Sequence, residues 1–162
     1  MIAGVGSMIQ VIEERHIDAP PDAVWPLVAD PELLAKWFGF AESITELGPQ
    51  RWRLHGRWGS KRSEVDVRLT EVRPARRLAW THERERLGAK PASRFSADTQ
   101  FAVELDPEAG ATRVRLVSRQ QPASFLRGVV MRLLGRRRLR STMRASLSRL
   151  SEVVQSGKGS AA

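Results

Sequence analysis

The pattern of hydrophobic and polar positions divides the chain into an opening strand with two short helices, a long series of strands, and a helical end. Residues 8–17 mix β-branched and polar residues with partial alternation, which is typical of a strand. Pro20 and Pro21 end that strand. Apolar residues at helical spacing then predict a short helix over about 21–29, with Asp22 favouring its first turn.

A second short helix is expected directly after the first. Asp30 has the side chain of an N-cap, and Pro31 follows at the first helical position, where a backbone N–H group is not needed. The helix is expected to close at Trp37-Phe38-Gly39. We expect Trp25 and Trp37 to pack these two helices across the mouth of the sheet rather than to take part in chemistry.

Six further strands are predicted between turn signals rich in Gly and Pro. They cover about 41–47, 51–57, 63–72, 77–85, 95–105 and 112–119. Alternation is clear in several of them. In residues 51–58, Trp, Leu and Gly occupy one face, while Arg and His occupy the other. One dry and one wet face is typical of an antiparallel sheet that is covered on one side.

The C-terminal part is predicted to be helical in two pieces. Apolar residues recur there every three or four positions and form a narrow stripe, made by Leu139, Met143, Leu147, Leu150 and Val154. The apolar residues of 126–134 fall on a rotated face, and the mismatch lies at Gly135-Arg136. We therefore expect helices over about 125–134 and 137–155, with a kink or short turn between them.

These elements form one expected domain over residues 8–155. At 162 residues, the chain is long enough for a single domain with a substantial core. Residues 1–7 are expected to be a disordered extension, so that Met1 and Met8 both stay open as the natural start. Residues 156–162 are expected to form a flexible tail.

The order of the elements and several local motifs resemble the SRPBCC superfamily, which includes START proteins, polyketide cyclases and the birch pollen allergen. The motifs are IDAPPDAVW (17–25), DPELLAKW (30–37), EVRP and RLAW within 71–80, and GATRV (110–114). The resemblance implies an α+β helix-grip fold. A seven-stranded curled antiparallel sheet would surround a long C-terminal helix, with a ligand cavity between them.

Two branches of the superfamily contribute to this resemblance. The motifs DPELLAKWFG and VRPARRLAWT look like chaperone-activator homologues. The C-terminal motif RRRLRSTMRASLSRLSEVV looks more like the polyketide cyclases. The subfamily therefore stays open between the two.

Composition limits the class of protein. The chain is 41% hydrophobic and 28% charged, which is ordinary for a soluble globular protein. It has no cysteine, which excludes disulfides, thiolate metal sites and cysteine nucleophiles and fits a cytoplasmic location. No apolar run is long enough for a transmembrane helix, and residues 1–7 lack the features of a signal peptide. The net charge of +9 is carried mainly by Arg spread through every segment, which we interpret as genome base composition rather than a binding surface.

The cavity that the resemblance implies would be lined by the dry faces of the strands and the inner stripe of the last helix. Such pockets are mostly apolar and contain a few polar groups. The predicted ligand-binding residues are Trp52, Trp58, Leu69, Trp80, His82, Thr99, Phe101, Ser118, Met143 and Leu147. Neighbouring inward positions are Leu54, Val67, Leu78, Val103 and Leu116. A lining rich in Trp suits a ring-bearing or acyl ligand, although each Trp taken singly is better explained by core packing.

His82 is the candidate catalytic residue. Alternation with Leu78 and Trp80 predicts that it points inward, where an imidazole could act as acid, base or ligand anchor. The alternatives are a core histidine hydrogen-bonded to a neighbour and a histidine turned outward near the strand end. His55 falls on the charged face and His16 near a strand end, so the histidine spacing predicts no metal site. No cofactor-binding motif is present, and no cofactor is expected.

The sequence leaves two alternatives for which face of the first strand points inward. One face carries Ile9, Val11 and Ile17 together with Glu13 and Arg15. If this face points inward, Glu13 and Arg15 would form a buried charge pair, since an unpaired buried charge is very costly. The opposite face is an equal candidate and carries Gln10, Ile12, Glu14 and His16.

A row of arginines follows the last helix at intervals of four residues, at Arg132, Arg136, Arg140 and Arg144. The row could meet an anionic membrane surface or an acidic protein. Alternatively, it is a solvated face whose side-chain stems cover apolar surface. No aromatic residues suited to base stacking are interleaved, so no specific nucleic-acid partner is expected.

The sequence therefore predicts a protein that binds a small hydrophobic ligand, lipid-like or polycyclic, in a cavity between the sheet and the last helix. Transport, sequestration or sensing of such a ligand needs no catalytic residue. The first alternative is an enzyme of the polyketide cyclase or dehydratase type, which would use polar groups such as His82, Thr99 and Ser118. The second is a protein-interaction module similar to the chaperone-activator homologues.

Overall fold

The computed structural model describes residues 8–88, 90–91, 96–122 and 135–160. The elements are β1 (Ile9–Ile17), α1 (Pro21–Ala29), α2 (Pro31–Leu34), β2 (Ser43–Gly48), β3 (Arg51–Trp58), β4 (Lys61–Arg73), β5 (Arg77–Leu87), β6 (Lys90–Pro91), β7 (Ser96–Glu108), β8 (Ala111–Pro122) and α4 (Arg136–Ser160). This order confirms the predicted helix-grip plan. Each predicted strand is present, and its ends lie within a few residues of those expected.

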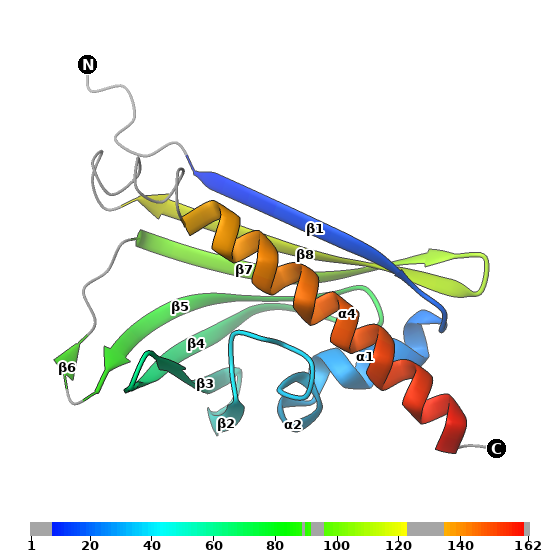
Figure 1. Cartoon of the computed structure of the whole chain (residues 1–162), viewed down its shortest axis with the longest axis horizontal. Helices are drawn as coiled ribbons and strands as arrows, with labels where there is room; N and C mark the ends of the chain where they lie inside the picture. The colour runs from blue at the N-terminus through cyan, green and yellow to red at the C-terminus, as the bar shows by residue number, and fades with distance from the viewer. Residues whose placement is uncertain (1–7, 89, 92–95, 123–134, 161–162) are drawn as a thin grey trace.

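One antiparallel sheet contains all the described strands. Its path runs β1-β8-β7-β5-β4-β3-β2, and the two-residue strand β6 pairs with β5 outside this path. Figure 1 shows the sheet curling around α4, with β2, β3 and β4 below the helix, β7 passing behind it and β1 along its upper side. The inner face of the sheet and the apolar stripe of α4 therefore form the core.

The two short helices close one end of this arrangement. Asp30 caps α2 as expected, because its Oδ1 accepts a hydrogen bond from the Glu32 N–H at 3.0 Å. Trp37 follows α2 and is completely buried, and its indole N–H donates to the Leu27 carbonyl of α1 at 2.7 Å. Trp25 is half-buried against the same core. Both tryptophans therefore hold the helices in place.

Helix α4 is joined to the loop after α2 through Ser146. The buried Ser146 Oγ accepts a hydrogen bond from the Gly39 N–H at 2.9 Å and donates one to the Thr142 carbonyl at 2.7 Å. A Cβ atom at Gly39 would lie only 3.0 Å from that Oγ, which explains why a residue without a side chain stands there. The contact positions the neighbouring Phe38 against the sheet.

The end of α4 differs from the expectation. The helix continues through Ser160, beyond Gln155, so residues 156–160 are helical rather than part of a flexible tail. Lys158 supplies a physical reason, because its ammonium group contacts the backbone carbonyl and the carboxylate of Asp18 in the loop after β1. The expected extension 1–7 and the expected helix 125–134 lie outside the described residues.

Candidate functional site

Strand pairing identifies the inner face of the sheet, because residues directly opposite each other in an antiparallel pair share a face. Trp80 of β5 stands opposite Leu69 of β4 and Phe101 of β7, and Phe101 stands opposite Ser118 of β8. The inward side chains that are buried there include Trp52, Leu54, Val67, Leu78, Trp80, Phe101, Val103, Leu116 and Ser118, together with Met143 and Leu147 from α4. The side chain of Trp58 lies outside the described part of the chain.

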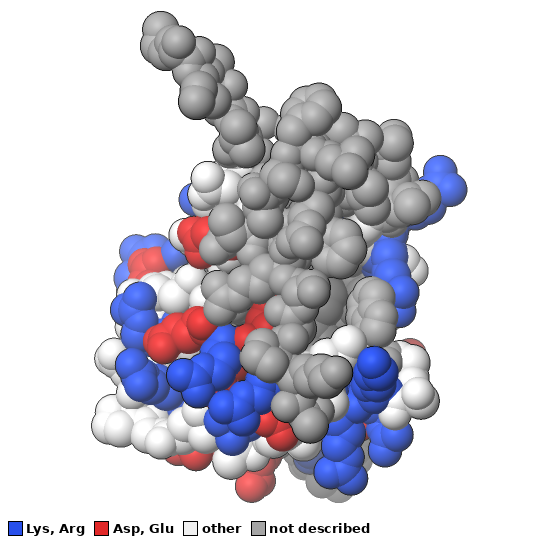
Figure 2. Space-filling model, turned by 90° about the vertical axis from the view of Figure 1, so that its left-hand side faces the viewer, with Lys and Arg blue, Asp and Glu red and all other residues white. Residues whose placement is uncertain are grey.

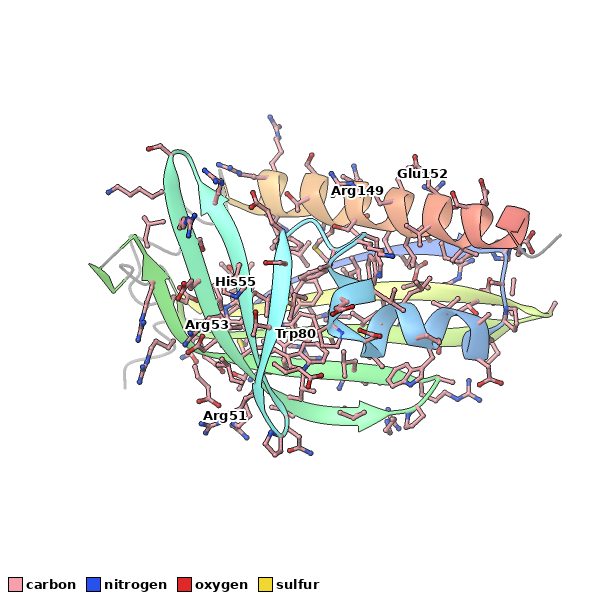
Figure 3. The ribbon with its side chains drawn as sticks, turned by 90° about the horizontal axis from the view of Figure 1, so that it is seen from below. Arg51, Arg53, His55, Trp80, Arg149 and Glu152 are labelled. Atoms are coloured by element: carbon pink, nitrogen blue, oxygen red, sulfur yellow. The ribbon has the colours of Figure 1, made fainter. Side chains whose placement is uncertain are left out.

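Aromatic rings fill the middle of this face. The rings of Trp80 and Phe101 stack at 5.2 Å with an interplanar angle of 19°. Phe38 meets both of them edge to face, at centroid distances of 5.5 and 5.2 Å, and Trp52 lies 6.5 Å from Trp80. Figure 3 places Trp80 among crowded side chains between the strands and the helices. We call Phe38, Phe40, Trp52, Trp80 and Phe101 the aromatic cluster.

Two members of the aromatic cluster were missing from the predicted lining. Phe38 and Phe40 follow the second short helix, in a segment without strand alternation, so the parity argument could not select them. Phe40 is 37% exposed and lies 5.7 Å from Phe101 and 5.1 Å from Phe38. The cluster therefore reaches the protein surface through Phe40. The sequence signal was the dense aromatic run at 37–40.

Several inward residues beyond Trp80 and Phe101 are only partly buried. The strands β5 and β7 are paired as far as Thr81 and Gln100, and toward the left of Figure 1 they separate. Ile9, Trp52 and Val67 are buried on this side, but other inward positions are half-buried. They include Gly56, Val65, His82, Glu85, Thr99 and Gln120. We call these six residues the open half of the inner face, and it is the candidate site.

A β-bulge shapes the open half. Val67 pairs with His82 and Asp66 with Arg84, so Glu83 is an extra residue in β5. The bulge reverses the alternation, which brings Glu85 to the inner face opposite Val65, while Arg84 stands opposite Asp66 on the outer face. The prediction that His82 points inward is confirmed by its pairing with Val67.

The bulge also brings His82 and Glu85 together. His82 Nδ1 lies 3.0 Å from Glu85 Oε1, and the two side chains are 22% and 27% exposed. Because a carboxylate can only accept, Nδ1 is the donor in this contact. The contact orients the imidazole and leaves Nε2 as the second polar atom of the ring. Strict alternation from His82 would have placed Arg84 inward, so the sequence alone did not reveal this pair.

The outer face of the sheet carries ion pairs. Arg53 binds Asp66 through two hydrogen bonds of 2.7 and 3.1 Å, which lower the pKa of Asp66 despite the opposing effect of burial. His55 lies on the same face and contacts Thr45 at 2.9 Å, as the charged alternation predicted. Figure 3 shows Arg51, Arg53 and His55 along one strand, and Figure 2 shows positive and negative side chains interspersed on that end of the molecule.

Two hollows open on the outer face. One has a volume of about 180 Å³ and a floor of small apolar side chains, Ala79, Ala102 and Val117. At its rim, Arg77 is held by Glu104 at 3.0 Å and by Glu71. The other, also about 180 Å³, is lined by Arg51, Asp66, Glu83 and Arg84 among others. Their charged rims are occupied by ion pairs within the sheet, so neither is the apolar site that the sequence predicted.

Strand β1 presents Glu13 to α4. Glu13 stands opposite the buried Leu116, and its side chain is 13% exposed. It accepts from Arg140 at 2.8 Å and pairs with Arg144 at 3.2 Å. Burial alone would raise the pKa of Glu13, but the hydrogen bonds and charges of the two arginines outweigh it and hold the pKa below its usual value. The face that carries Glu13 therefore points inward, and Glu13 pairs with α4 rather than with Arg15.

The contact of Glu13 with Arg140 and Arg144 changes the interpretation of the arginine row. Arg140 and Arg144 recur four residues apart, and both reach the same carboxylate, so their spacing serves an internal ion pair. Arg136 is exposed at the start of α4, and Arg132 lies outside the described residues. Figure 3 shows Arg149 and Glu152 on the side of α4 turned away from the sheet.

A metal-binding site and a membrane-spanning helix are two further features that a chain of this kind could have. Among the residues that the structure describes, no group of three or more His, Asp or Glu side chains could hold a metal ion. In the same part of the chain, no helix is long and apolar enough to cross a membrane.

Comparison with known proteins identifies the family. Residues 8–155 match the family described as polyketide cyclase / dehydrase and lipid transport. The chain belongs to this family. The resemblance to the SRPBCC superfamily is thereby confirmed, and membership supports a fold that binds hydrophobic ligands. No curated protein matches the chain.

Solved structures with the same fold are distant in sequence. TTHA0849 from Thermus thermophilus is 21% identical, with a TM-score of 0.72 over 92% of this chain and 99% of that one. Ara h 8.0201 is 15% identical, with a TM-score of 0.69 over 93% and 99%. Mll3558 from Rhizobium loti is 16% identical, with a TM-score of 0.68 over 92% and 99%. At these identities, the similarity shows the helix-grip fold alone.

Proposed function

We propose that the protein binds a small, largely hydrophobic molecule, lipid-like or polycyclic, at the open half of the inner face. The observation that carries this proposal is the change in burial along that face. Along β5 and β7, the inward residues Trp80 and Phe101 are buried, and the next inward residues, His82 and Thr99, are half-buried. The partly exposed ring of Phe40 lies against Phe101 at this boundary. The family supports the same class of ligand.

The composition of the open half suits such a ligand. Val65 and Gly56 provide apolar surface and space, and the aromatic cluster provides flat ring faces at the inner end. His82, Glu85 and Thr99 add a few polar groups that would orient the molecule. The absence of cysteine favours a cytoplasmic location for this activity.

Replacing Gly56 by Leu is expected to weaken binding by filling the open half. Gly56 points inward opposite Ser63, and among the described residues a Cβ atom there would meet only the Phe40 carbonyl oxygen, at an ordinary contact distance of 3.6 Å. The fold should therefore accept the substitution while the ligand loses space. With the neutral fluorescent probe N-phenyl-1-naphthylamine, we expect affinity to fall about tenfold, which corresponds to a steric cost of about 1.4 kcal/mol.

The control for this experiment is the neighbouring residue on the opposite face. Arg57 is exposed and points outward, opposite Arg62. The Arg57→Leu protein adds the same side chain outside the proposed site, so it should bind the probe as the unchanged protein does. Equal affinities of the Gly56→Leu and Arg57→Leu proteins for the probe would contradict the proposed site.

A polyketide cyclase or dehydratase activity is the second candidate, and the contact between His82 and Glu85 favours it. A carboxylate that fixes Nδ1 presents Nε2 for proton transfer, which is the arrangement of a general base. Such an enzyme would convert its ligand chemically, whereas a binding protein would release it unchanged. The third candidate, an interaction module using the arginine row, has less support because Arg140 and Arg144 are bound to Glu13. Its remaining surface in the described part of α4 includes the exposed Arg136 and Arg137.

A further inference from the structure

The indole N–H of Trp80 is a buried donor without an acceptor in the described part of the chain. Trp80 is 2% exposed, and its Nε1 has no hydrogen-bond partner among the described residues. Other buried donors in the same core are satisfied. The indole N–H of Trp37 donates to the Leu27 carbonyl at 2.7 Å, and the Thr112 hydroxyl donates to the Ala19 carbonyl at 2.7 Å. Buried polar groups normally form hydrogen bonds, and Trp80 is therefore an exception among the described residues of this core.

This unsatisfied donor is unfavourable for folding alone. A buried N–H group that loses its water without gaining an acceptor destabilises a protein by about 1–3 kcal/mol. The indole ring is nevertheless held firmly, since it stacks on Phe101 at 5.2 Å and meets Phe38 edge to face at 5.5 Å. A Phe at this position would provide ring contacts without the unsatisfied group. The donor is thus preorganised and ready to bind an acceptor.

Trp80 also lies at the boundary of the open half. The next inward residue along β5 is His82, which is half-buried, and Leu69 opposite Trp80 is half-buried as well. Phe38 and Phe101 pack against Trp80, and Trp52 lies in the next row of the sheet, with Val67 and His82. A molecule bound at the open half would therefore meet Trp80 at its innermost end.

We propose that the Trp80 N–H donates a hydrogen bond to an oxygen atom in the apolar body of the bound molecule. This inference rests on the proposed function and narrows its ligand class. The ligand carries a ketone, ether or phenolic oxygen on a ring system or an equally apolar frame, and a plain hydrocarbon of the same shape binds less well. Ring faces of the aromatic cluster contact the body of the molecule, and the indole N–H fixes the position of its oxygen.

A matched pair of probes tests this inference. 1-Tetralone and tetralin have the same bicyclic frame, and only 1-tetralone carries a carbonyl oxygen. Each is titrated against bound N-phenyl-1-naphthylamine, and the ratio of the two affinities is compared between proteins. The Trp80→Phe substitution is expected to lower the preference for 1-tetralone over tetralin about fivefold, which is the usual effect of losing one hydrogen bond. The control Trp25→Phe makes the same ring change outside the aromatic cluster and should leave the ratio unaltered.

The indole N–H signals in a nitrogen-15 NMR spectrum provide a second readout on the unchanged protein. 1-Tetralone should move the Trp80 signal downfield, and tetralin should not. If 1-tetralone displaces the fluorescent probe but the Trp80 signal stays in place and the affinity ratio survives Trp80→Phe, the inference is wrong and the proposed function stands. If the fluorescent probe itself fails to bind, the proposed function is wrong, and this inference fails with it.

Discussion

Replacing Trp37 by Ala is expected to lower the free energy of unfolding by about 3–5 kcal/mol, the range for removing a large buried aromatic side chain. Trp37 is completely buried and meets Phe38 at a centroid distance of 6.0 Å. Its N–H also donates to the Leu27 carbonyl, so its loss separates α1 from the segment that follows α2. Denaturant unfolding followed by far-UV circular dichroism measures the change.

Two further variants separate the ring of Trp37 from its hydrogen bond. Trp37→Phe keeps a ring but leaves the Leu27 carbonyl without its donor, so a smaller loss of about 1–3 kcal/mol is expected. Trp25→Ala removes a half-buried ring and should cost less than about 2 kcal/mol. Equal losses for Trp37→Ala and Trp25→Ala would show that Trp37 does not hold the helices as described.

Replacing Glu13 by Gln is expected to lower the free energy of unfolding at neutral pH by about 1–2 kcal/mol. Breaking a fully buried ion pair costs about 3–5 kcal/mol, and the partial exposure of Arg140 and Arg144 reduces that value. The pKa of Glu13 is lower in the folded protein than in the unfolded chain. Its contribution to stability is therefore present above the unfolded pKa and is lost as the pH falls through the folded pKa.

The pH dependence supplies the sharper measurement. The stabilities of the unchanged protein and the Glu13→Gln protein should differ at pH 7 and converge as the pH falls below the usual carboxylate range. Glu14→Gln is the matched control, because Glu14 points outward and its contacts with Arg113 and Arg115, both 3.3 Å long, are exposed. That substitution should change stability by less than about 1 kcal/mol. A difference for Glu13→Gln that persists undiminished at acid pH would contradict the role assigned to the ion pair.

Local signals in the sequence were enough to predict the helices and strands, and the resemblance to the SRPBCC superfamily supplied their arrangement. Turn signals and alternation located the strands, and the Asp30-Pro31 signature located α2, because these patterns depend on neighbouring residues. The inward direction of Trp80 and His82 followed from the same alternation. The extension of α4 through Ser160 could not be predicted from local patterns, because it depends on contacts between Lys158 and Asp18, which are far apart in the sequence.

The site was less predictable because it depends on long-range geometry. The bulge at Glu83 carries no clear local signal, and without it the inward position of Glu85 cannot be inferred. The pairing of Glu13 with α4 joins residues at opposite ends of the chain, which periodicity cannot connect. Likewise, the missing acceptor at Trp80 is a property of the packed core and is visible only in the structure.

The most direct test of the proposed binding function is native mass spectrometry of the protein purified from the organism that makes it. We expect a discrete added mass from one small organic molecule, which organic solvent releases chemically unchanged. This mass should be diminished in the Gly56→Leu protein and retained in the Arg57→Leu protein. An added mass that the Gly56→Leu protein retains in full would contradict the proposed site, and the absence of any added mass from the unchanged protein would contradict the binding function itself.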